Sequence, residues 1–124
     1  MLRTALLVAA LALSACRGET DASAPPPAAA RMEGGVQVAD VTVGTEGFEP
    51  AAVALRSGVP ARLVFTRTTE DSCGTEVHSP TLGIEETRLP LGQAVPIEFT
   101  PGEAGRYTFA CGMDMMEGAV VVRS

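Results

Sequence analysis

The sequence contains no lysine and only a single histidine, and both shortages restrict what the protein can do. The formal net charge is −6 and the arginines are scattered singly, which argues against binding nucleic acid or docking electrostatically on anionic lipid. There is no phosphate-binding loop and no Ser-His-Asp order in a credible context, so neither a nucleotide enzyme nor a hydrolase is predicted. We therefore expect a binding protein and not an enzyme.

The chain begins with a short charged and apolar segment. Arg3 precedes an apolar run from Leu6 to Leu13, and small residues stand directly before Cys16. This is the layout of a secretory signal peptide over residues 1–15, and the run is much shorter than the roughly 20 residues that span a bilayer. The alternative is an ordinary cleaved signal, with Cys16 as a bystander.

The segment Leu13-Ser14-Ala15-Cys16 resembles the lipobox of bacterial lipoproteins. The resemblance implies that Cys16 is lipidated and anchors the mature protein to a bacterial membrane, in the periplasm or at the cell surface. Residues 16–35 have almost no large apolar side chain and include a run of three prolines between alanines. We expect them to form a flexible Ala/Pro-rich linker ahead of one domain at residues 36–124.

From Val36 onward the sequence changes to short alternating runs that are rich in valine and separated by glycine and proline. Such runs predict strands, and no segment outside the signal has a useful length of helical periodicity. Many short strands favour an all-β sandwich or barrel. The strands are expected near residues 36–43, 51–55, 61–67, 94–100, 106–111 and 118–123, with Phe65, Phe99, Tyr107 and Phe109 as core candidates.

A loop near the C-terminus concentrates sulfur. Met113, Met115 and Met116 lie within five residues of Cys111, although the whole chain has five methionines. A surface loop offers methionine little burial, so packing does not explain this density. The density therefore indicates a ligand role. Thiolate and thioether are soft donors that prefer Cu(I) among biological metals, so the loop predicts copper binding.

Two stretches, 105–111 and 116–122, resemble the end of plastocyanin- and amicyanin-type proteins, and residues 53–58 and 63–65 resemble that family's second and third strands. The resemblance covers about 36–122 and implies a Greek-key β-sandwich of cupredoxin type. In that family an aromatic strand delivers the copper cysteine, which corresponds here to Cys111, and the axial methionine corresponds to Met116. The family's first copper histidine follows the third strand, where this sequence has Cys73.

The sequence departs from the family because a blue-copper site needs two histidines, and only His78 is present. The combination of Cys73, Glu76-Val77-His78 and the methionine loop resembles a cupredoxin-like subgroup found alone or fused to copper-transport proteins. If the segment after Cys73 is extended, His78 faces away from that cysteine. The implied ligands are Cys73, Cys111, Met113 and Met116, with Met115, His78 and Glu76 as further candidates.

The function expected from these observations is a membrane-anchored protein that holds Cu(I) for copper handling, delivery or resistance, with a copper transporter or cuproenzyme as partner. Two alternatives stay open. One is a cupredoxin-like electron-transfer protein. The other is a metal-free interaction domain with a Cys73–Cys111 disulfide, because paired cysteines in an oxidising compartment are usually bridged.

Overall fold

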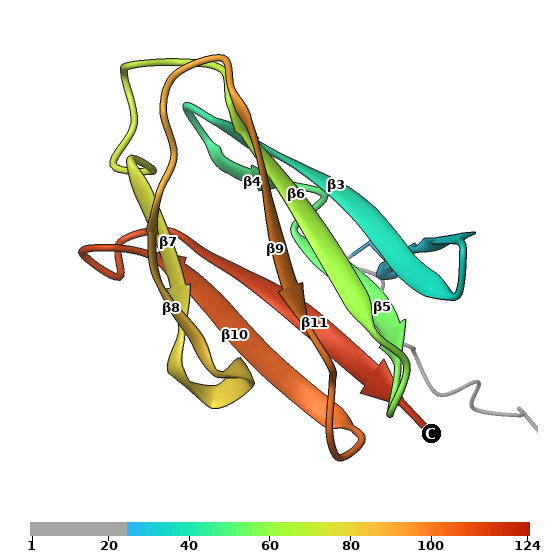
Figure 1. Cartoon of the computed structure of the whole chain (residues 1–124). Coiled ribbons are helices and arrows are strands. Elements are labelled where there is room, and N and C mark those ends of the chain that lie inside the picture. The colour runs from blue at the N-terminus through green and yellow to red at the C-terminus, as the bar shows by residue number, and fades with distance from the viewer. Residues whose placement is uncertain (1–24) are drawn as a thin grey trace, which may run out of the picture.

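The computed structural model describes residues 25–124, which form two β-sheets packed face to face (Figure 1). The predicted all-β sandwich is confirmed. Sheet A contains, in spatial order, β1 (Ala28–Ala29), β5 (Ala52–Arg56), β11 (Glu117–Arg123), β10 (Gly105–Cys111), β7 (Glu76–Ser79) and β8 (Ile84–Arg88). Sheet B contains β2 (Arg31–Glu33), β3 (Val36–Gly44), β6 (Ala61–Arg67) and β9 (Ala94–Phe99), with β4 (Gly47–Glu49) paired to β3.

The ordered structure starts ahead of Val36, where the sequence predicted the domain to begin. β1 pairs in parallel with β5, and β2 pairs antiparallel with β3, so residues 28–29 and 31–33 of the expected flexible linker belong to the sheets. The physical reason is that these residues complete two sheet edges, and Arg31 adds ion pairs with Asp40 and Glu33. The expected signal peptide and Cys16 lie outside the described residues.

Two strands that the sequence did not predict stand at the edge of sheet A. β7 and β8 pair with each other, and β7 also pairs with β10. Their polar composition concealed them, because Val77 is the one buried apolar residue of β7 and Ile84 is the one buried residue of β8. A single 3-10 turn, η1 (Pro80–Leu82), connects the two strands. No helix in residues 25–124 is long and apolar enough to cross a membrane.

The core lies between the sheets and is centred on three aromatic rings. Phe48, Phe65 and Phe109 pack edge to face, with ring centroids 4.8 to 6.1 Å apart. Gly118 lies against the Phe109 ring so closely that a side chain there would collide with it. Phe65 and Phe109 are fully buried as expected, whereas Phe99 and Tyr107 are only half-buried and line the margin of the core.

Strand register brings the two sulfur-bearing segments to one end of the sandwich. Cys111 pairs with Val77, and Ala110 pairs with His78, at the junction of β10 and β7. Because side chains alternate across a strand, Cys111 and Val77 face the core while His78 faces outward. The loops 68–75 and 112–116 meet at this end, and the C-terminus lies at the other (Figure 1).

Candidate metal centre

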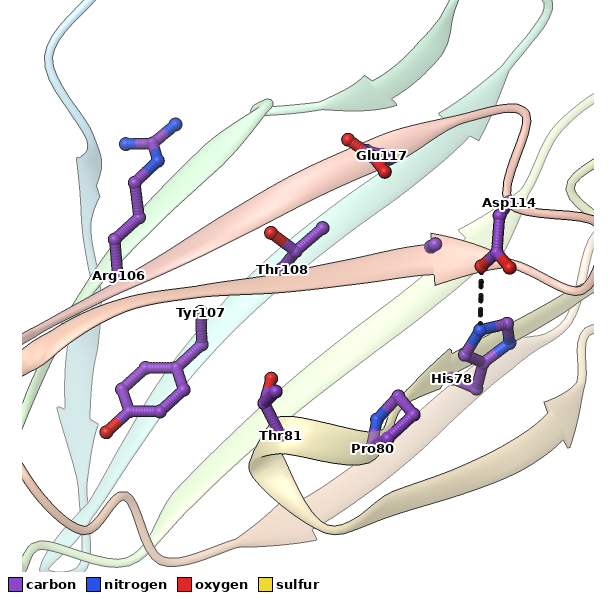
Figure 2. Close-up of a pocket in the computed structure, with 9 residues that line it drawn as sticks. His78, Pro80, Thr81, Arg106, Tyr107, Thr108, Asp114 and Glu117 are labelled. Carbon is purple, nitrogen blue, oxygen red and sulfur yellow. Dashed lines mark hydrogen bonds and ion pairs between the residues drawn. The ribbon is translucent and has the colours of Figure 1, made fainter.

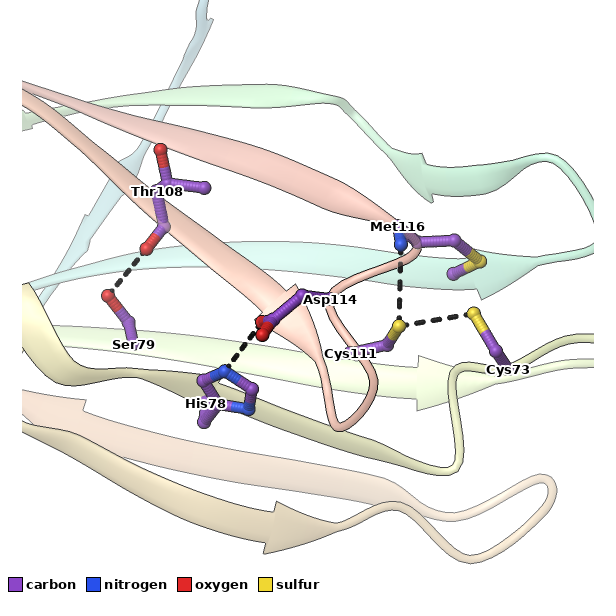
Figure 3. Close-up of polar contacts among 7 residues, drawn as sticks. All are labelled: Cys73, His78, Ser79, Thr108, Cys111, Asp114 and Met116. Atoms are coloured by element: carbon purple, nitrogen blue, oxygen red, sulfur yellow. Dashed lines mark hydrogen bonds and ion pairs between the residues drawn. The ribbon is translucent and has the colours of Figure 1, made fainter.

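The two cysteines of the described chain meet at the end of the core. Cys73 Sγ lies 3.1 Å from Cys111 Sγ, and both are free thiols (Figure 3). This distance corresponds to a thiol–thiol hydrogen bond and not to a disulfide, because a covalent S–S bond is about 2.03–2.05 Å long. Residues separated by 38 positions are thus brought within reach of one shared ion.

The β10–β11 hairpin holds Cys111 in place through its backbone. Cys111 N–H donates to the Met116 carbonyl at 3.0 Å, and Asp114 N–H donates to the Cys111 carbonyl at 2.9 Å. Met116 N–H in turn approaches Cys111 Sγ at 3.3 Å. The sulfur is therefore fixed by the same short loop that carries the methionines.

The electrostatics of the thiol pair are unequal. Burial raises the pKa of the Cys111 thiol, but hydrogen bonds from the Cys73 thiol and from loop N–H groups outweigh it, so the net pKa lies below its ordinary value. The pKa of Cys73 is raised, because its thiol bonds to Cys111 and is partly desolvated. The Cys111 thiol is therefore the more acidic of the two.

The loop that carries Cys73 packs tightly against its surroundings at Gly74. A Cβ at this position would collide with a methyl group of Val43 and would lie 3.3 Å from the terminal methyl of Met116. Gly74 N–H also donates to Ser72 Oγ at 3.1 Å. Met116 is therefore the methionine that lies beside the Cys73 segment, where it packs against the core.

The other two predicted thioethers are on the outside of the loop. Met113 and Met115 are 75% and 74% exposed. They flank Asp114, whose φ of 57° is in the left-handed region. Both side chains thus lie on the solvent side of the loop.

The donors that gather at this end are suited to a soft metal ion. In residues 25–124 no group of three or more His, Cys, Asp and Glu side chains is arranged to hold a metal. The donors that do converge are two thiols, with one thioether beside them and two more on the adjoining loop. Thiol and thioether sulfurs are soft donors, and this set of donors fits Cu(I).

His78 and Glu76, the two non-sulfur candidates, are not brought to the thiols. Both point to the outer face of sheet A, as the strand period predicted for His78. His78 Nε2 lies 2.9 Å from Asp114 Oδ1, and Figure 3 shows this pair apart from the sulfur cluster. Glu76 lies against Gly112, where a Cβ would come within 2.7 Å of its carboxylate.

Sequence reasoning missed the contribution of Asp114. Asp114 is not among the predicted ligands, and nothing local in the sequence indicates its contact with His78. The available signal was the alternation of side chains along the strand, which places His78 on the outer face. His78 pairs with Ala110 near the end of β10, next to the loop that follows that strand.

Comparison with known proteins agrees with this fold. The profile of the cupredoxin-like domain family matches residues 3–122, so the chain belongs to this family. The resemblance to cupredoxins is therefore confirmed. No match was found among the curated proteins.

Several solved structures are similar. The metal-binding domain of the Cu(I)-exporting P-type ATPase CopA of Streptococcus pneumoniae D39, solved with Cu(I), is 32% identical, with a TM-score of 0.75 over 80% of this chain and 97% of that one. A copper binding protein solved by NMR in the apo form is 35% identical, with a TM-score of 0.72 over 79% of this chain and 98% of that one. Auracyanin B, at 14% identity and a TM-score of 0.53 over 81% and 92%, shares the fold alone.

Proposed function

We propose that this protein binds Cu(I) as cargo through Cys73, Cys111, Met113 and Met116, and that it serves copper handling, delivery or resistance. The observation that carries the proposal is the contact between the two thiols, 3.1 Å apart beneath a methionine-bearing loop. The two similar proteins at 32% and 35% identity are described as a Cu(I)-bound domain and a copper binding protein, which supports the same function.

Each residue has a distinct part in this proposal. Cys73 and Cys111 supply thiolates, and binding the ion releases the protons of the two thiols. Met116 contributes a thioether from the core side. Met113 donates from the exposed part of the loop, where an incoming or outgoing ion passes, and Met115 is the further candidate there. Exposed thioethers suit exchange with a copper transporter or a cuproenzyme better than an enclosed site.

We further propose that Cys16 carries lipid and tethers the domain to a bacterial membrane, in the periplasm or at the cell surface. The described chain enters through β1, at one edge of sheet A, whereas β7 and β8 form the opposite edge beside the loop. A tether at that position leaves the thiol pair accessible. Fractionation of cells that produce Cys16→Ser tests this step, because the variant is expected to leave the membrane fraction.

The decisive experiment is a Cu(I) titration against a chelator of known affinity, under reductant and without oxygen. Cys111→Ser is expected to lose more affinity than the roughly 10–100-fold that removal of an outer-shell partner costs. Met116→Ala should lose less than Cys111→Ser. Met32→Ala, which changes an exposed methionine on β2, is the matched control and should bind as the wild type does. Equal affinity in all four proteins would refute the site.

The same samples separate the two alternatives. A native protein with a Cys73–Cys111 disulfide that binds no copper after reduction would support the metal-free interaction domain. Strong visible absorption on adding Cu(II) would support electron transfer, since a Cu(I) carrier is colourless. We expect the reduced protein to bind copper without colour.

A further inference from the structure

The β10–β11 loop, residues 112–116, is attached to the rest of the domain on two sides. On the core side it continues into Cys111 and Met116. On the outer side its central residue, Asp114, reaches over the end of β10 to the ring of His78 on β7 (Figure 3). This contact joins residues 36 positions apart, and within residues 25–124 it is the hydrogen bond that ties the loop to a strand other than its own two.

The geometry of His78 makes the contact specific. A carboxylate only accepts hydrogen bonds, so Nε2–H is the donor and Asp114 Oδ1 the acceptor. The His78 side chain is 18% exposed, and its Nδ1 is buried without a hydrogen-bond partner among residues 25–124. The ring therefore has one polar contact within this part of the chain, and that contact is to the metal loop.

The position of Asp114 lets its contact with His78 affect the two exposed methionines. Asp114 stands between Met113 and Met115, at the residue whose backbone is left-handed. Asparagine and aspartate tolerate that conformation better than most residues with a side chain. Apart from the bond to His78, the apex is held by the turn bond from Asp114 N–H to Cys111 O. Loss of the side-chain contact would leave two exposed thioethers on a loop fixed only at its base.

We propose that His78 is a positioning residue for the copper site, and that its bond to Asp114 latches the loop that presents Met113 and Met115 to the thiols. The inference rests on the proposed function. It gives His78 a part other than that of ligand: the residue acts from the outer face of sheet A, through Asp114. A side chain that fixes donor atoms before binding raises affinity by lowering the conformational cost of binding.

Figure 2 shows the His78–Asp114 contact among the residues that line a surface groove. The His78–Asp114 pair stands at one end of a groove of about 350 Å³ on the outer face of sheet A, which Tyr107, Thr81 and Arg106 also line. Asp114 is 68% exposed there, so water competes for its carboxylate. The latch is thus a partly exposed contact, whose effect on copper affinity should be that of an outer-shell partner and not that of a ligand.

The test is a double-mutant cycle with His78→Ala, Asp114→Gly and both together, measured as Cu(I) affinity and dissociation rate. Glycine keeps the left-handed backbone allowed while removing the carboxylate. Each single variant is expected to lose about 10-fold in affinity, at the lower end of the range for outer-shell partners, mainly through faster dissociation. The double variant should lose no more than the weaker-binding single variant, since both remove the same bond. Asp114→Asn keeps an acceptor oxygen and should bind almost as the wild type does.

A second measurement needs no copper. In the reduced, metal-free protein, methyl NMR relaxation of Met113 and Met115 should show greater mobility in His78→Ala than in the wild type and in Asp114→Asn, while Met32 stays unchanged. Unchanged methyl relaxation overturns the latch, and so do additive affinity losses in the cycle. A large loss in His78→Ala together with wild-type binding in Asp114→Gly would make His78 a ligand. If the wild type and Cys111→Ser both fail to bind copper, the proposed function falls, and the methyl measurement still decides the latch.

Discussion

The two faces of sheet A differ in chemistry although the same strands build both. The inner face packs against sheet B with residues such as Phe109 and Val77, which are 0% and 1% exposed, and it ends in the thiol of Cys111. The outer face, at the same end, carries His78 on β7 and two carboxylates, Glu76 and Glu86. Alternation of side chains along β7 and β10 causes this difference, and a register shift between β7 and β8 adds to it where Ile84 is buried and Glu86 is exposed.

Two different kinds of force hold the loop 112–116. On the inner face, burial fixes Cys111, and Met116 packs against the core. On the outer face, one hydrogen bond at Asp114 and one close approach at Gly112 set the position of the loop. Changes on the inner face should therefore alter stability, while changes on the outer face should alter the loop and local charges with little effect on stability.

The largest effect is expected on the inner face, from Phe109→Ala. The ring is fully buried between Phe48 and Phe65, with centroids at 4.8 and 5.5 Å, so truncation leaves a cavity. The free energy of unfolding should fall by about 3–5 kcal/mol, measured by urea denaturation. The matched control is Thr108→Ala, one residue earlier on the exposed outer face, which should stay within about 0.5 kcal/mol of the wild type. Equal losses in both variants would contradict the division between the faces.

The inner face was the part of the structure that the sequence predicted well. The alternation from Arg106 to Cys111 placed Phe109 and the cysteine on one face, and the same period placed His78 outward. The large buried side chains of this strand follow the local period, while the small Ala110 between them is buried as well. Phe48 was missed because it stands in a three-residue strand, β4, too short to show a period.

The outer face and the loops that meet at the thiol pair were harder to predict from the sequence. β8 carries charged residues at most positions, so its pairing with β7 leaves no hydrophobic pattern in the sequence. The close approach of Cys73 to Cys111 depends on the path of the loop 68–75, including the tight packing at Gly74, and no local pattern encodes that path. The bond between His78 and Asp114 likewise joins two segments through tertiary structure alone.

A smaller effect on the free energy of unfolding should distinguish the methionine that packs against the core from an exposed one. Met116 packs against the core, whereas Met115 is 74% exposed. In the metal-free protein Met116→Ala should lower the free energy of unfolding by about 1 kcal/mol, part of the value for burying a whole side chain. Met115→Ala should leave it within about 0.5 kcal/mol. Thermal and urea unfolding of both variants under reductant provide the comparison, and a Met115→Ala loss as large as that of Met116→Ala would place both side chains on the core.

The smallest effect belongs to the outer face alone. The pKa of Glu86 is raised, chiefly by its hydrogen bond with Glu76 and then by repulsion between the two carboxylates. Glu76→Gln removes the second charge, so the pKa of Glu86 should fall toward its ordinary value in an NMR titration of its carboxyl carbon. Glu98→Gln, which changes a carboxylate paired with Arg62 on sheet B, is the control and should leave the pKa of Glu86 unchanged.

The sign of the accompanying stability change follows from linkage. A carboxyl whose pKa is raised on folding contributes stability below its ordinary pKa, and that contribution is lost as pH rises through the raised value. Glu76→Gln should therefore remove a small pH dependence in the mildly acidic range and leave the unfolding free energy at neutral pH no lower than in the wild type. A Glu86 pKa that does not respond would mean that the two strands carry independent charges. The outer face would then act on the loop 112–116 only through neutral contacts and the His78 bond.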